Sequence, residues 1–324
     1  MRQQGRGHET NPSVYGSKPG ASAHSREDDS TPMPRIITHT PGSSDGASAA
    51  LALQHSDHPW LRPDDLSVPM LPDQAQRALQ LVGDPEVTIA KLAAVVSKDP
   101  VLATRVLGMA NSALYGAMSP LRSVSDAVVR LGTRTVRNVV VTVSMQSQLK
   151  SPEVYGHEGS RFMEHAVGTA YVAHLVADHR KGDVEEAFLC GLLHDIGKLV
   201  ILKTAHQYQQ RHHAVIRSDE LRAALTQHHA VCGALALGFW NVPGEVRDVV
   251  RFHHAFEDAS DPEAAAICYA ANLLSHRYGF GCQPEGDAVL EDAVFPYLEL
   301  DATWLARADV RAPGLFNAAR QALG

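Results

Sequence analysis

The sequence has few aromatic residues, few cysteines and no long apolar run. Aromatic residues make up 6% of its 324 residues, and its four cysteines include no Cys-x-x-Cys pair. That cysteine usage argues against a disulfide scaffold and favours a reducing compartment. No apolar run reaches the roughly 18 residues that a membrane-spanning helix needs, and no apolar segment follows the first residues as in a secretory signal. These absences predict a cytoplasmic protein without a membrane segment.

The chain also lacks an excess of positive charge. It carries 29 Lys and Arg against 36 Asp and Glu, a net charge of −7 with histidine neutral. A protein that coats nucleic acid would be basic, so nucleic acid is an unfavoured partner. A hydrophobic content of 44% nevertheless supports a substantial core and excludes a wholly disordered chain.

One segment departs from this charge balance. Residues 101–150 contain a single acidic residue, Asp126, and six basic ones: Arg105, Arg122, Arg130, Arg134, Arg137 and Lys150. Two interpretations are open, a surface for an anionic partner or the solvated face of a helix.

The N-terminal residues have the composition of a tail. Large apolar residues are rare over residues 1–50, where Gly, Ser, Pro, Thr and His predominate. Such a segment cannot bury enough surface to offset the entropy lost on ordering. We therefore predict a disordered tail over residues 1–60, with Trp60 as the residue that docks on the folded part.

From residue 65 onward the apolar residues recur at helical spacing almost without interruption. The pattern predicts an all-α protein with an N-terminal helical subdomain (65–150), a second helical subdomain (151–285) and a C-terminal helical extension (286–324). Helices are expected over 161–180, from Asp183 to about Val200, and over 218–238, 243–254, 262–278 and 286–300. The weakly amphipathic segment 302–324 is expected to pack only on the outside.

The run from Val139 to Val143 is rich in residues that favour strands. Alone it could be a buried strand. Because helical patterns lie on both sides and no partner strand is evident, a buried helix is the favoured interpretation.

Histidine is unusually frequent: the chain has 18, and twelve of them lie between residues 165 and 276. His194 and Asp195 fall within an apolar stretch, where a carboxylate is costly to bury unless it is paired or bound to a metal. Taken alone, this pair could form an ion pair or a hydrogen bond. His228-His229 and His253-His254 could likewise be surface or helix-end features.

The combination of these residues favours a metal site. Imidazole and carboxylate ligands on several helices are how metal centres are built within helical bundles, and they suit Fe, Mn or Zn. The predicted ligands are His165, His194, Asp195, His229, His253 and His254. Lys198 could meet a phosphate group as a point charge. Histidines 174, 179, 206, 212, 213 and 276 are interpreted as solvated.

The motifs around these residues resemble a known family. Residues 193–198, LHDIGK, preceded by His165, resemble the HD phosphohydrolase superfamily. The upstream segments KDPVLATRVLGMANSALYG (98–116) and SDAVVRLG (125–132) are similar to the HDOD domain, the HD-related output domain of bacterial signalling proteins. The segments HAVCG (229–233) and FWNVP (239–243) and the pair His253-His254 continue the resemblance, which covers about two thirds of the chain.

The resemblance implies an N-terminal helical bundle joined to an HD-like helical bundle, and a role in bacterial signal transduction. In catalytic HD relatives and in HD-GYP cyclic-di-GMP phosphodiesterases, the six residues above would be the metal ligands. The acidic residue expected to close that set is replaced by Asn272, and Ala255-Phe256-Glu257-Asp258 stands where the GYP signature would follow. These departures argue against hydrolysis of cyclic di-GMP but leave six ligands for a metal.

Two functions therefore remain open. The first is a non-catalytic regulatory module that binds a signalling protein or a small nucleotide. The second is a metal-dependent phosphohydrolase that acts on a nucleotide or a cyclic dinucleotide, in which Lys198 would stabilise phosphate charge. Either would hold one or two divalent ions, and the first could function with none. The sequence leaves the oligomeric state open, and a homo-oligomer is one of the alternatives.

Overall fold

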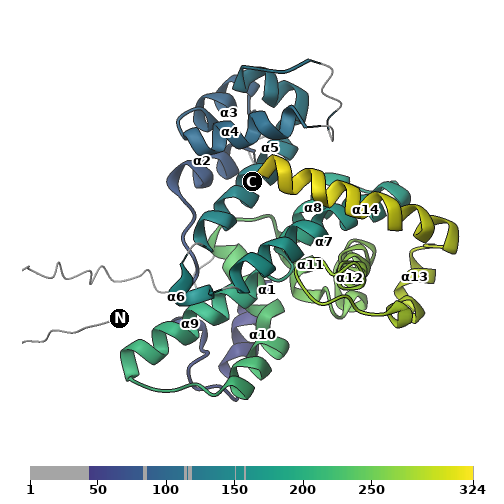
Figure 1. The fold of residues 1–324 in the computed structure, drawn as a ribbon. Coiled ribbons are helices and arrows are strands. Elements are labelled where there is room, and N and C mark those ends of the chain that lie inside the picture. The colour runs from purple at the N-terminus through teal and green to yellow at the C-terminus, as the bar shows by residue number, and fades with distance from the viewer. Residues whose placement is uncertain are drawn as a thin grey trace, which may run out of the picture. The chain divides into compact units, whose positions relative to one another are not determined.

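The computed structural model describes residues 44–82, 86–112, 115, 119–149, 151–156 and 158–323 (Figure 1). Within those ranges the chain forms helices and no strand, which confirms the predicted all-α class. None of the described helices combines the length and the apolar character that crossing a bilayer requires.

The first bundle consists of α2 (Asp73–Val82), α3 (Ile89–Val96), α4 (Pro100–Ala110) and α5 (Val124–Gln148). Local sequence explains where these helices begin. The Thr88 side chain accepts from the Lys91 amide, and Asp99 accepts from two amides ahead of the first-turn Pro100. Ser123 caps α5, where its side chain accepts from the Asp126 amide.

Helix α5 contains a bend and the predicted valine run. Gly132 has a φ of 78°, a left-handed conformation that separates a short first part of the helix from a longer second part. The segment from Val139 to Val143 is helical and no residue in it is more than 6% exposed. The prediction of a buried helix is therefore confirmed.

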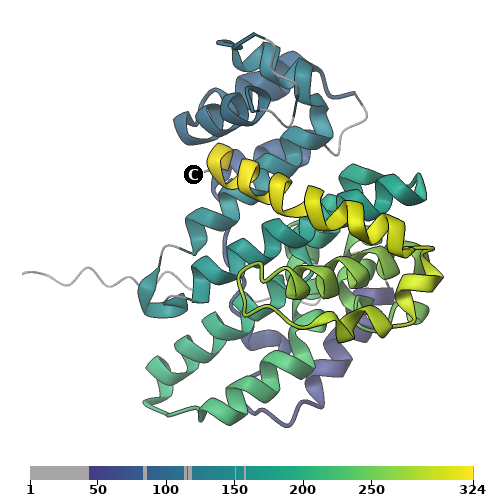
Figure 2. The same ribbon diagram turned by 45° about the vertical axis from the view of Figure 1, so that its right-hand side comes forward.

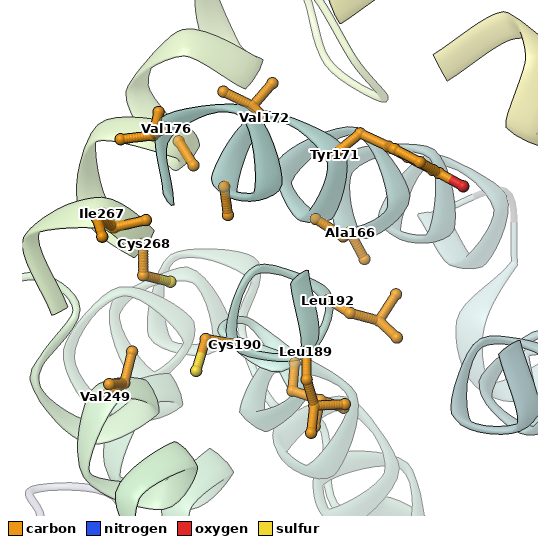
Figure 3. Close-up of a cluster of buried hydrophobic side chains, with 14 of the residues drawn as sticks. Ala166, Tyr171, Val172, Val176, Leu189, Cys190, Leu192, Val249, Ile267 and Cys268 are labelled. Atoms are coloured by element: carbon orange, nitrogen blue, oxygen red, sulfur yellow. The ribbon is translucent and has the colours of Figure 1, made fainter. Parts of the chain in front are cut away.

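The second bundle follows the short helix α6 (Pro152–Tyr155). Its members are α7 (Glu158–Arg180), α8 (Val184–Leu193), α9 (Ile196–His212), α10 (Ser218–Phe239), α11 (Gly244–Phe252) and α12 (Pro262–Arg277). Figure 3 shows part of the buried core that these helices share, to which α7 contributes Val172, α8 contributes Leu189 and α12 contributes Ile267.

The prediction of one helix from Asp183 to about Val200 is wrong. Asp183 does cap α8, but α8 ends at Leu193 and α9 begins at Ile196. The intervening His194-Asp195 turn redirects the chain so that Gly197 lies directly against α10. A side chain on Gly197 would collide with the carbonyl of His229 and the amide of Gly233.

The N-terminal prediction also needs correction. Residues 44–60 are not a disordered tail, because α1 (Ser44–Gln54) forms there and packs on α10. Trp60 docks as expected: it is 2% exposed, and its indole N–H donates to Glu220 at 2.7 Å. The remainder of the predicted tail, residues 1–43, lies outside the described residues.

Two expectations for the C-terminal extension are wrong. The segment 286–300 is not one helix but a 3-10 turn, Asp287–Glu291, followed by α13 (Val294–Tyr297). Helix α14 (Ala302–Leu323) does more than cover the outside, since Trp304, Phe316 and Leu323 are buried. Figures 1 and 2 show α14 reaching from the second bundle to the first, where it contacts α4. Several of its buried residues are alanines, which weaken the amphipathic signal in the sequence.

Gly197→Ala should be strongly destabilising because its methyl group would meet backbone atoms of α10. We expect a loss of roughly 3 kcal/mol or more in the free energy of unfolding, or failure to fold. Gly314→Ala, in α14, is the matched control, since a methyl group there meets nothing within 4 Å. Urea titrations of the two variants measure the difference, and equal stabilities would contradict this account of the α9–α10 contact.

Candidate metal centre

The six predicted ligands lie together, although they come from four separate parts of the chain. His165 is in α7, His194 and Asp195 form the turn between α8 and α9, His229 is in α10, and His253 and His254 follow α11. All are buried except His254, which is exposed and marks the solvent side of the cluster.

The cluster divides into two groups of three residues that could each hold a metal ion. His165, His194 and Asp195 form one group, and His229, His253 and His254 form the other. Asp195 faces both, because its Oδ2 lies 3.3 Å from His194 Nε2 and its Oδ1 lies 3.3 Å from His229 Nε2. The geometry fits one ion or a pair of ions, and the ligand roles remain predictions.

Four backbone carbonyls fix the orientation of the histidines. A carbonyl only accepts, so a ring nitrogen hydrogen-bonded to it must carry the proton. The Nδ1–H groups of His165, His194, His229 and His253 donate to the carbonyls of Phe280, Gly191, Leu225 and Val250, respectively. The unprotonated Nε2 atoms therefore face the centre of the cluster, as metal-binding imidazoles do.

Several of these Nε2 atoms lie close to one another, although an unprotonated nitrogen can only accept a hydrogen bond. His229 Nε2 lies 3.0 Å from His254 Nε2 and 3.4 Å from His253 Nε2. His194 Nε2 is buried and has no hydrogen-bond partner among the described residues. Lone pairs that face each other and a carboxylate repel unless a cation or a proton lies between them. The donor set therefore fits a divalent metal ion.

The charge states also suit metal binding. Burial lowers the pKa of His165 and of His254 to about 4, and it lowers the pKa of His229 and His253 as well. Burial alone would raise the pKa of Asp195, but the nearby His194 and Lys198 hold it well below its usual value. Near neutral pH His165, His229, His253 and His254 are thus neutral and the Asp195 carboxylate is ionised.

Lys198 pairs with Asp195 and is not free in this structure. Its Nζ lies 2.5 Å from Asp195 Oδ2, and about a third of its side chain is exposed. Its predicted contact with phosphate would require exchange of that ion pair, and it stays a prediction.

Asn272 occupies the position where the sequence comparison places an acidic ligand. It is 6% exposed, and its side-chain Oδ1 lies 3.0 Å from His165 Nε2. An amide oxygen and an unprotonated ring nitrogen are both acceptors, so they repel unless a cation lies between them or the amide is turned so that its NH2 group donates. The Asn272 side chain therefore lies next to the nitrogen that His165 would offer to a metal.

His276 is a neighbour of the site that the sequence analysis took to be solvated. Its ring centroid lies 4.8 Å from that of His165, its side chain is 30% exposed, and Glu285 Oε1 is 3.7 Å from its Nδ1. Its spacing could have identified it, because it follows Asn272 by four residues on α12 and therefore shares its helix face.

Mild acid should destabilise the metal-free protein. In an unfolded chain the histidine pKa is about 6.5, whereas burial lowers it to about 4 for His165. Between these values the unfolded chain binds more protons, so the free energy of unfolding decreases as pH falls through this window. From about pH 7 to about pH 5, His165 alone would contribute a loss of about 2 kcal/mol. Urea unfolding in the presence of a chelator measures it.

The control for this prediction is a surface histidine. His165→Gln should reduce the pH dependence by the share of that residue, since His229, His253 and His254 still contribute. His213→Asn should retain the full dependence, because residue 213 is exposed and asparagine tolerates its left-handed backbone. An unfolding free energy that does not change with pH in the parent protein would contradict the prediction.

Comparisons with known proteins add to this geometry. Among curated proteins, an uncharacterised protein of Treponema pallidum is 28% identical over 221 residues, covering 63% of this chain and 41% of its own length. Ribonuclease Y of Campylobacter fetus is 25% identical over 203 residues, covering 63% of this chain and 33% of its own length. The chain therefore spans less than half the length of the curated relatives it matches.

Solved structures share the fold. A proposed metal-dependent phosphohydrolase from Shewanella amazonensis is 20% identical with a TM-score of 0.60, covering 80% of this chain and 93% of that one. A proposed signal transduction protein from Marinobacter aquaeolei is 25% identical with a TM-score of 0.58, covering 79% and 59%, respectively.

The family is established by a match over more than half the chain. The HDOD domain model matches residues 68–256, which include both the first bundle and all six clustered residues. This range contains the motifs on which the resemblance in the sequence rested. The chain belongs to the HDOD domain family.

Proposed function

We propose that this protein is a metal-binding regulatory module of bacterial signal transduction that acts by binding a partner rather than by hydrolysis. The observation that carries the proposal is the set of inward-facing Nε2 atoms around the buried carboxylate of Asp195. Such a set is costly to maintain without a cation. The similarity to the proposed signal transduction protein from Marinobacter aquaeolei supports the regulatory part.

His165, His194 and Asp195 would hold one ion, and His229, His253 and His254 a second. Fe, Mn or Zn suits this mixture of imidazole and carboxylate. A bound ion would supply positive charge able to polarise a phosphoryl oxygen or to lower the pKa of water. The chain itself orients the rings of His165, His194, His229 and His253, because a backbone carbonyl accepts a hydrogen bond from the Nδ1–H group of each.

Asn272 supports the non-catalytic reading. It replaces an acidic ligand with a neutral amide, and that amide contacts His165. The signal would then be read by a protein partner or a small nucleotide. The described cysteines are all free, in keeping with a cytoplasmic location.

A metal-dependent phosphohydrolase is the second candidate. It is favoured by the partly exposed ammonium group of Lys198 beside Asp195, which could bind a phosphate. The similarity to ribonuclease Y of Campylobacter fetus, whose name denotes action on RNA, also favours a phosphohydrolase. This candidate accounts less well for Asn272.

Protein purified without chelator should contain about one or two Fe, Mn or Zn ions per chain. His194→Gln should lose most of this metal, because the Nε2 atom of His194 is a predicted metal ligand that has no hydrogen-bond partner among the described residues. His213→Asn is the surface control and should retain it. Elemental analysis of the three proteins, with circular dichroism to verify folding, tests the site; absence of metal from the parent protein after reconstitution would refute it.

The metal-loaded protein should not hydrolyse cyclic di-GMP or a generic phosphodiester such as bis(p-nitrophenyl) phosphate. The reason is that its ligand set lacks the acidic group at position 272. Chromatographic assays of product measure this directly. Turnover that is lost in Asp195→Asn but kept in His213→Asn would establish the phosphohydrolase instead. That result would still agree with the proposed metal site.

A further inference from the structure

A second site, away from the metal cluster, lies where three parts of the chain meet. A cavity of about 210 Å³ is enclosed by residues of α4 and α5 from the first bundle, of α7 and α8 from the second, and of α14. It is smaller than the pockets of about 300–1,000 Å³ that take drug-sized ligands. The cavity therefore suits one small molecule.

The cavity is lined by two opposite charges that do not neutralise each other. Glu185 lies in the first turn of α8, and Arg311 lies on α14. Neither forms an ion pair with the other or with another residue in the part of the chain that the structure describes. Glu185 Oε2 accepts a hydrogen bond from Asn138 at 2.8 Å, which fixes the carboxylate and leaves its second oxygen available.

A buried hydroxyl on the cavity wall lacks a good partner. Tyr171 is 7% exposed, and the contact of its hydroxyl is with the thioether of Met109 at 3.9 Å, a weak acceptor. Burial raises its pKa, so the group stays protonated and can donate. Figure 3 shows the hydroxyl of Tyr171 directed away from the other labelled side chains.

The rest of the wall mixes polar and apolar side chains. The polar ones are Tyr115, Thr135, Asn138, Thr142 and His174, and His174 is close enough to interact electrostatically with both Glu185 and Arg311. Among the apolar ones, Val139 and Leu175 are buried, while Phe188 and Leu315 are half-buried. Phe188 packs edge-on against Tyr171, with ring centroids 5.0 Å apart. A ligand must therefore present an anion, a cation and an apolar group within a small volume.

We propose that this cavity binds a free α-amino acid with an apolar side chain. Its ammonium group would pair with Glu185, its carboxylate would pair with Arg311, and its side chain would lie among Leu175, Phe188 and Leu315. A guanidinium can bind a carboxylate through two parallel hydrogen bonds, which gives this arrangement specificity. The site is separate from the metal cluster and does not depend on it.

Binding there would connect the two bundles. The ligand would touch α5, the α7–α8 pair and α14 at once, so it would favour the arrangement in which these elements lie together. Helix α8 ends directly before His194, and α7 carries both Tyr171 and His165. The cavity is thus placed to report the level of an amino acid to the rest of the module.

Isothermal titration with L-phenylalanine, L-leucine and L-methionine tests the proposal on the full chain. At least one of them should bind at micromolar to millimolar concentration. Phenethylamine lacks the carboxylate and 3-phenylpropionate lacks the ammonium group, so each should bind at least tenfold more weakly than L-phenylalanine if that is the ligand. Equal binding of these analogues would overturn the pairing of both charges.

Charge variants locate the site. Glu185→Gln and Arg311→Gln should each weaken binding about tenfold or more. Glu245→Gln, in the first turn of α11, and Arg307→Gln, one turn from Arg311 on α14, are exposed controls that should leave binding unchanged. Because residue 311 is exposed, its variant should fold even if Glu185→Gln does not.

The experiments can refute the metal-site proposal and the amino-acid proposal independently of each other. Metal content should be normal in the Glu185 and Arg311 variants, since neither residue is near the six clustered ligands. The amino-acid proposal is overturned if none of the three amino acids binds at millimolar concentration, or if binding survives Arg311→Gln. Loss of metal in His194→Gln with amino-acid binding preserved would support both.

Discussion

The ionised carboxylate of Asp195 lies nearly buried among histidine side chains. Ordinarily such a charge is costly to bury, and here the nearby His194 and the ion pair with Lys198 lower that cost. Three features of the surrounding structure hold the histidines and Asp195 together: the break between α8 and α9, the contact of α9 with α10 at Gly197, and the backbone carbonyls that orient the histidine rings. Each of these features positions a donor atom rather than merely filling the core.

The helical class and much of the site could be predicted from sequence because the signals are local. Apolar spacing, Asp183 at the start of a helix, and histidines next to apolar residues all act within a few positions of the chain. The sequence predicts the six residues that the structure brings together, and the resemblance to HD proteins implies an acidic residue where Asn272 stands. Their family resemblance supplied the ligand pattern that spacing alone leaves ambiguous.

The errors concern features that tertiary contacts decide. Nothing within residues 183–200 requires the helix to stop, since the stop is imposed by the close approach of Gly197 to α10. Residues 44–60 have too few apolar side chains to predict order, but Leu53, Trp60 and Leu61 find a complementary face on α9 and α10. His276 looks like a surface residue until α12 is seen to lie against α7.

The packing of the N-terminal segment redefines what a folded unit of this protein is. The family match begins at residue 68, yet Leu53, Trp60 and Leu61 complete a core with Val200 and Ile201 of α9. At the other end, Leu323 enters the core of the first bundle from beyond the matched range. A fragment trimmed to residues 68–256 would therefore expose apolar faces that the flanking segments cover in the whole chain, and it would be prone to aggregate. The range of the family match and the extent of the packed core do not coincide in this protein.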